Sequence, residues 1–140
     1  MDFFQLSGEI KSPYIYFIYI DGFLYVGETQ SFPAIRWGAH LTNEGTLLKK
    51  LVSLGGDLGK KNQRIKFISF NLIDLFDLNL CKNFKRSTQA IEHELHVRIK
   101  CKPSIVNNLT LISDTEKTAP SRFKYWDQVN LIVDHIIEKL

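Results

Sequence analysis

An arginine and a histidine stand one helical turn apart in the segment that begins at Pro33. Arg36 and His40 are four residues apart, and residues at that spacing share one face of a helix. Arginine carries a planar, permanently charged fork that suits phosphate, and histidine exchanges a proton near neutral pH. The pair therefore fits a phosphate-binding or proton-transferring surface, although a solvent-exposed Arg/His edge would have the same spacing.

Two tyrosines lie on the strands that precede this helix. Asp21-Gly22 stands between two alternating apolar runs, and Asp-Gly in that position is a strong signal for a tight hairpin turn. Counting outward from the turn pairs Ile18 with Tyr25. It also puts Tyr16 and Tyr25 on one face as diagonal neighbours, roughly 7–8 Å apart at the backbone. The two hydroxyls therefore converge on one patch, with an ordinary aromatic pair in a core as the alternative.

Four short pieces of the chain, taken in order, resemble the GIY-YIG nuclease superfamily, which includes cleavage domains of nucleotide-excision repair, homing endonucleases and some restriction enzymes. The resemblance covers roughly residues 12 to 110. The pieces are Tyr14-Ile15-Tyr16, Tyr25-Val26-Gly27, Arg36-Trp37 with His40, and Glu94 with Ala90 before it and Pro103 and Asn107 after it.

The resemblance implies a role for the residues of the hairpin and the first helix. Tyr16 or Tyr25 would position or deprotonate the attacking water. Arg36 would hold the scissile phosphate, and His40 would assist a tyrosine or the phosphate. Because a free phenol titrates about three units above neutral pH, forming the phenolate requires roughly 4 kcal/mol of preferential stabilisation by nearby cations.

The resemblance also implies a divalent cation. Glu94 would anchor a single Mg²⁺, or Mn²⁺ in its place, and Asn107 would complete the catalytic set. One carboxylate with water in the remaining positions suits magnesium, because that ion gives up its hydration shell reluctantly.

A helical wheel chooses between Glu92 and Glu94 for this role. At 100° per residue over positions 90–102, the apolar side chains form one broad arc that includes Glu94 and Arg98, whereas Glu92 lies on its border. A carboxylate inside an apolar arc must pair, become neutral or bind a metal. The wheel therefore identifies Glu94 as the misplaced charge. An ion pair with Arg98, four residues on, would satisfy it, whereas the resemblance to the superfamily implies that Glu94 binds the metal.

Two positions depart from the pattern of the superfamily. Tyr14 stands where the superfamily usually has glycine, and Glu28 adds a negative charge directly after the second motif. The hairpin is also about two residues shorter than is common, which preserves the alternation of its faces.

The basic residues are concentrated in two segments, although the chain carries a net charge of only +3. Residues 49–66 carry six basic side chains against Asp57 alone, and residues 82–102 carry six against two glutamates. Such patches could contact several backbone phosphates, but a charge run is also typical of a solvated surface. The residues predicted to bind nucleic acid are Lys60, Lys61, Arg64, Lys82, Lys85 and Arg86.

The remaining sequence predicts one α/β domain over residues 1–140. Apolar residues make up 44% of the chain, and no repeat or long linker divides it. We expect a small three-stranded sheet, formed by the hairpin and a strand at 65–73, flanked by helices that include one at 44–54. An extra amphipathic helix at about 121–140 would pack on the core or form a homodimer seam. No segment has the length and hydropathy of a membrane span, so an intracellular, cytoplasmic protein is expected, with Cys81 and Cys101 reduced.

The sequence therefore predicts a metal-dependent endonuclease acting on DNA. A catalytically inactive nucleic-acid-binding module of the same fold and an RNA-directed nuclease remain as alternatives. Sequence-specific and structure-specific cleavage, and the oligomeric state, stay open.

Overall fold

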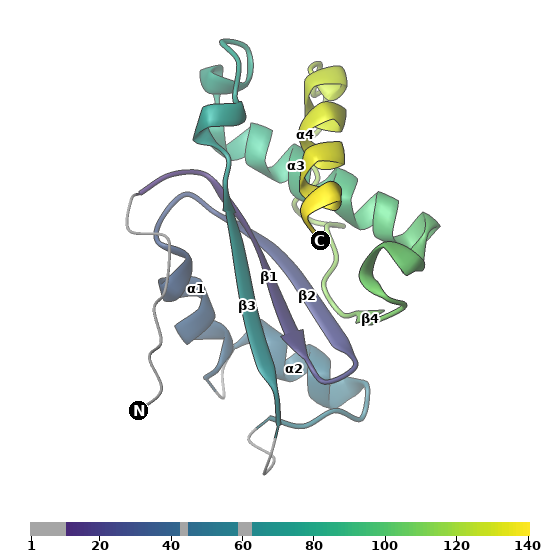
Figure 1. Cartoon of the computed structure of the whole chain (residues 1–140). Helices are drawn as coiled ribbons and strands as arrows, with labels where there is room; N and C mark the ends of the chain where they lie inside the picture. The colour runs from purple at the N-terminus through teal and green to yellow at the C-terminus, as the bar shows by residue number, and fades with distance from the viewer. Residues whose placement is uncertain (1–10, 43–44, 59–62) are drawn as a thin grey trace.

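The computed structural model describes residues 11–42, 45–58 and 63–140. It is an α/β structure with a four-stranded mixed sheet and four α-helices (Figure 1). The strands are β1 (Tyr14–Ile20), β2 (Phe23–Thr29), β3 (Ile65–Asn71) and β4 (Thr110–Leu111). The helices are α1 (Pro33–His40), α2 (Thr46–Ser53), α3 (Phe84–Cys101) and α4 (Trp126–Lys139). Three short 3₁₀ turns are η1 (Ile73–Leu75), η2 (Leu80–Lys82) and η3 (Pro103–Val106).

The hairpin has the predicted register. Strand β1 pairs antiparallel with β2, with Tyr16 opposite Gly27 and Ile18 opposite Tyr25. The turn between the strands needs a residue with a positive φ, and Asp21 supplies it at 49°. Strand β3 pairs antiparallel with the other edge of β1. The prediction of a third strand beside the hairpin is therefore confirmed.

The sheet has a fourth strand, so the prediction of three strands was wrong. Strand β4 is two residues long and pairs in parallel with β2, with Phe23 opposite Thr110 and Leu24 opposite Leu111. The sheet order is β3-β1-β2-β4. A strand of two residues has too few positions to show an alternating pattern, and tertiary pairing alone defines it.

Each face of the sheet carries its own hydrophobic cluster. Ile15, Phe17, Leu24 and Val26 pack with buried residues of α3 and α4. Tyr16, Ile18 and Ile20 point to the other face, where they meet Trp37 of α1 and Leu47 and Leu51 of α2. Strand alternation therefore sends both candidate tyrosines toward α1, and the neighbouring strand positions toward α3.

The C-terminal helix packs back on the core, in agreement with the first of the two expectations for it. Its buried stripe consists of Val129, Ile132, Val133 and Ile136, and α4 lies across α3 (Figure 1). The stripe that was considered for a dimer seam is thus covered within the chain. The helix begins at Trp126, later than position 121, because Arg122 has a positive φ of 55°.

No helix in the part of the chain that the structure describes has both the length and the apolar character needed to cross a bilayer.

Candidate active site

A buried hydrogen bond joins the hairpin to α1. The Tyr16 hydroxyl lies 2.8 Å from Nε2 of His40, and both side chains are almost completely buried. The Tyr25 ring stacks beside Tyr16 with centroids 6.5 Å apart, and lies 4.5 Å from the His40 ring. The structure thus brings together three of the residues that the sequence singled out.

Gly27 makes this arrangement possible. A Cβ at this position would lie 2.3 Å from both the hydroxyl and the Cζ of Tyr16. The Tyr16 ring therefore lies flat against the backbone of β2, and only glycine leaves room for it. The glycine of the Tyr-Val-Gly motif thus has a steric role beside the site.

Arg36 completes the group from the exposed side of α1. Its guanidinium lies close enough to the Tyr16 hydroxyl to oppose the rise in the pKa of that phenol. Tyr16 is buried and hydrogen-bonded to His40, whereas Tyr25 is only half-buried and remains open to solvent.

The site keeps its titratable groups neutral. Burial, helped by the charge of Arg36, lowers the pKa of His40 to about 4, so the ring is an uncharged acceptor at neutral pH. Burial also raises the pKa of Tyr16, against the opposing effect of Arg36. For Tyr25, burial followed by the negative charge of Glu92 raises the pKa to about 12. Neither phenol is ionised at neutral pH, and an additional positive charge is needed to form a phenolate.

Glu94 does not face this site, contrary to the helical-wheel prediction. Its Oε1 lies 2.8 Å from Nε of Arg98, which also binds Asp134 of α4 at 2.6 Å. The carboxylate is thus satisfied by the intrahelical pair that stood as the alternative. The structure thus places Glu94, the predicted metal ligand, in the contact between α3 and α4 and not beside the tyrosines.

Glu92 is the carboxylate of α3 whose charge acts on the tyrosines. It is 7% exposed, and burial followed by the nearby charge of Glu28 raises its pKa to about 8. Its charge in turn raises the pKa of Tyr25. Glu92 therefore shares one electrostatic environment with both tyrosines and Arg36, although it comes from a helix far along the chain.

The wheel failed because α3 has two covered sides of different chemistry. One side packs on the hydrophobic cluster with α4. The other lies along the edge of β2 and carries polar residues: Thr88, Glu92 and His96 are spaced four apart and all are buried. Meanwhile Val97, which the wheel placed in the apolar arc, is 38% exposed. Hydropathy identified the apolar buried side of α3 but gave no indication of the polar buried side.

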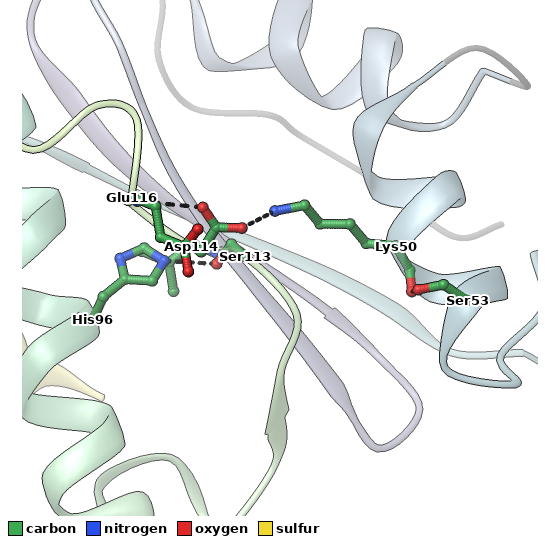
Figure 2. A network of polar contacts seen from close by, with 7 residues as sticks. Lys50, Ser53, His96, Ser113, Asp114 and Glu116 are labelled. Carbon is green, nitrogen blue, oxygen red and sulfur yellow. Dashed lines mark hydrogen bonds and ion pairs between the residues drawn. The ribbon is translucent and has the colours of Figure 1, made fainter.

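A hydrogen-bond network that the sequence did not predict covers the polar side of α3 (Figure 2). Nδ1 of His96 lies 2.7 Å from the Glu92 carbonyl, so it donates there and Nε2 accepts from the Ser113 hydroxyl at 2.8 Å. Ser113 Oγ also accepts from the Val26 amide at 2.9 Å. Burial lowers the pKa of His96 to about 4, which keeps the ring neutral. The signal that could have revealed this side was the polar spacing at 88, 92 and 96.

Next to this network, an ion pair links the loop after β4 to α2. Lys50 Nζ binds Asp114 Oδ2 at 2.6 Å, and Asp114 Oδ1 accepts from the Glu116 amide at 3.3 Å (Figure 2). Asp114 contributes negative charge around Glu92, and Lys50 offsets part of it. The loop after β4 therefore contributes to the charge around Glu92.

Asn107 has a local structural role. It ends η3 with a φ of 55°, a left-handed conformation that asparagine tolerates. Its amide donates to the Ser104 carbonyl within the same turn. The structure does not bring it into the group formed by the tyrosines and Arg36.

The residues predicted to contact nucleic acid fall into different places. Burial raises the pKa of the half-buried Glu28, and the positive charge of nearby Lys85 partly opposes this rise, so Lys85 borders the site. Arg64 is exposed beside the hairpin turn, where its carbonyl accepts from the Asp21 amide. Lys82 and Arg86 lie in a separate cleft. Lys60 and Lys61 fall outside the described residues.

The described residues offer a single buried carboxylate rather than a ready-made metal cage. Within residues 11–42, 45–58 and 63–140, no three side chains of His, Cys, Asp or Glu gather as ligands. Glu92 nevertheless fits an ion held by one carboxylate and water, because a nearby cation would relieve the charge repulsion between Glu92 and Glu28.

Comparison with known proteins gives no match to this chain among family models, curated proteins or solved structures. The resemblance to the GIY-YIG superfamily therefore depends on the motif residues and on their arrangement.

Proposed function

We propose that this protein is a metal-dependent endonuclease of the GIY-YIG kind that hydrolyses phosphodiester bonds in DNA, with Glu92 as the metal-binding carboxylate. The observation that supports this most is the burial of Glu92, without a neutralising ion pair, in the same environment as the tyrosine pair and Arg36. A buried, uncompensated carboxylate is costly for folding, and such groups concentrate at functional sites.

The side chains divide the work of hydrolysis between binding and water positioning. Arg36 is exposed and permanently charged, so it binds the non-bridging oxygens of the scissile phosphate. Tyr16 holds His40 in place through their buried hydrogen bond and lies beside Arg36. Tyr25, open to solvent, orients the water that attacks phosphorus. This division assigns the water to Tyr25 and makes Tyr16 a positioning residue.

Glu92 anchors the divalent ion in this proposal. The ion supplies positive charge that favours the ionised carboxyl, stabilises the phosphoryl oxygens and lowers the pKa of nearby proton donors. Glu28, Asp114 and Lys50 set the charge around it. Since Glu92 raises the pKa of Tyr25, neutralising its charge brings that phenol closer to ionisation.

A nucleic-acid-binding module without cleavage is the second candidate. Two observations favour it. The pKa of Glu92, at about 8, leaves the carboxyl largely protonated at neutral pH, and the described residues offer no further ligands grouped around it. Such a module would retain the Arg36 and Lys85 contacts and bind phosphate without cutting.

Cleavage assays with two carboxylate variants separate these possibilities. Plasmid, branched DNA and RNA are incubated with Mg²⁺ or Mn²⁺ and with the parent protein, Glu92→Gln or Glu94→Gln. We expect the parent to cut DNA, Glu92→Gln to lose activity on the order of 10³-fold, and Glu94→Gln to retain it. Binding without cleavage by the parent would support the module. Preferential cutting of RNA would change the substrate class, and equal activity of the parent and Glu92→Gln would remove Glu92 from the mechanism.

A further inference from the structure

A basic cleft lies apart from the tyrosine site, between the start of α3 and the segment that leads into α4. It measures about 230 Å³, and four basic side chains line it: Lys82, Arg86, Arg122 and Lys124. None of its lining residues is acidic. Arg122 and Lys124 come from a stretch that sequence analysis had assigned to the C-terminal helix. We propose that this cleft binds backbone phosphates of the nucleic acid at a distance from the scissile bond.

The cleft is held in shape by contacts between its two segments. An Arg86 guanidinium nitrogen donates to the Ser121 carbonyl, and Lys82 Nζ lies 3.5 Å from the Tyr125 hydroxyl. Lys82 also stands 5.7 Å from the centroid of the Tyr125 ring. These contacts join residues 35 and 43 positions apart in the chain. Lys82 and Arg86 are therefore held in place before any ligand arrives, which reduces the entropy lost on binding.

The four cations have no carboxylate partner in the described part of the chain. The ion pairs there join Lys50 to Asp114, and Arg98 to Glu94 and Asp134. Four like charges around one cleft repel each other, and an anion removes that repulsion. Arg122 additionally adopts a φ of 55°, a backbone conformation that is uncommon for residues other than glycine, asparagine and aspartate.

The composition of the cleft favours phosphate groups of a polymer. Two guanidinium groups match the geometry of phosphate oxygens, and the two ammonium groups add charge without demanding a fixed orientation. Four cations are more than one phosphate needs, and a nucleic-acid backbone presents phosphates in series.

The position of the cleft along α3 relates it to the proposed active site. Arg86 precedes Glu92 by six residues, which is about 9 Å along a helix axis. Lys85, beside Arg86 in sequence, lies near enough to Glu28 for its charge to act on that carboxyl, and so borders the tyrosine site. The first half of α3 thus carries Arg86 in the cleft and Lys85 near the tyrosine site. A nucleic-acid strand bound in the cleft is therefore also close to Lys85. This inference relies on the proposed function for its choice of ligand.

Salt-dependent DNA binding tests the cleft. The test variant is Arg122→Gln/Lys124→Gln, and the matched control is Lys100→Gln/Lys102→Gln, which removes the same charge from exposed positions at the other end of α3. Both are made in a Glu92→Gln background so that the duplex stays intact. Fluorescence anisotropy with a labelled duplex gives the affinity at several NaCl concentrations, and thermal melting checks that each variant is folded.

We expect the cleft variant to reduce the slope of log affinity against log salt by about 1 to 2 units, since each lost phosphate contact is worth about 0.9. The control should keep the slope of the parent. Equal slopes in the two variants, or a parent that does not bind DNA at low salt, would overturn the proposal. Plasmid cutting by the protein with Glu92 intact is measured separately. A protein that binds through the cleft but never cuts would refute the endonuclease and leave the cleft standing.

Discussion

The two sides of helix α3 place a carboxylate in opposite environments. Toward α4, Glu94 is partly exposed and shares Arg98 with Asp134. Toward the edge of β2, Glu92 is buried beside Glu28, and its pKa is raised to about 8. The first arrangement is what a stable helix contact requires. The second works against folding once the carboxyl ionises, and carboxyls in such environments concentrate at functional sites.

The largest effect on the contrast between the two sides of α3 is expected from a substitution of Glu92. Because its pKa is raised from about 4.5 to about 8, the folded state holds a proton that the unfolded state releases. The free energy of unfolding therefore falls as the pH rises through this range. Glu92→Gln should remove the penalty and stabilise the protein at pH values above 8 by a few kcal/mol, on the order of 1.4 kcal/mol for each unit of pKa shift.

Denaturant unfolding at acidic and alkaline pH measures this gain. The stabilisation should be small near pH 4 and should grow toward pH 9. If Glu92 binds the ion as proposed, Mg²⁺ should raise the melting temperature of the parent but not of Glu92→Gln, which lacks the carboxylate. A variant that is less stable than the parent at pH 9 would mean that Glu92 is already neutralised within the fold.

A methyl group added at Gly27, on the hairpin, is expected to have the next largest effect. Gly27→Ala places Cβ where the Tyr16 hydroxyl now lies, so the ring must leave His40. We expect a loss of about 1–3 kcal/mol in the free energy of unfolding, as for other overpacked sites. We also expect a fall in cleavage on the order of 10²-fold from the displaced Arg36 and His40.

Gly22→Ala is the matched control, because a Cβ at Gly22 meets nothing within 4 Å. Thermal melting and plasmid cutting on the two variants give both readouts. If Gly27→Ala melts and cuts like Gly22→Ala, Tyr16 does not need its place against β2.

The smallest effect is expected on the side of α3 that faces α4. Arg98 and Asp134 have side chains 30% and 54% exposed, so their ion pair is screened by solvent. A double-mutant cycle with Arg98→Gln and Asp134→Asn should give a coupling energy of about 0.2–1 kcal/mol. Cleavage should be unaffected in both single variants. A coupling above about 3 kcal/mol would indicate a buried pair and would remove the contrast with Glu92.

The elements that form locally could be predicted from the sequence. The hairpin register follows from the Asp21-Gly22 turn and the alternation of its strands, and the buried stripe of α4 follows from helical spacing. The convergence of Tyr16, Tyr25 and His40 then needed only the correct placement of one adjacent helix. These features depend on neighbours within a few tens of residues.

Features that depend on distant partners were missed. Which glutamate of α3 faces the tyrosines is decided by where α4 and β2 contact the helix, and hydropathy does not contain that information. Strand β4 and the hydrogen bond of Ser113 to His96 likewise exist only because the chain returns to the edge of β2. The basic cleft was missed because Arg122 and Lys124 were read as part of a helix.

The pairing of the edge of β2 with the segment from Thr110 to Ser113 affects how the protein behaves in concentrated solution. Backbone amides of Thr110 and Ile112 donate to Gly22 and Leu24 at 2.9 Å, and Ser113 then takes the Val26 amide with its hydroxyl. A foreign strand seeking to extend the sheet there finds those groups already engaged. The segment from Thr110 to Ser113 thereby protects this edge of β2 against edge-to-edge aggregation.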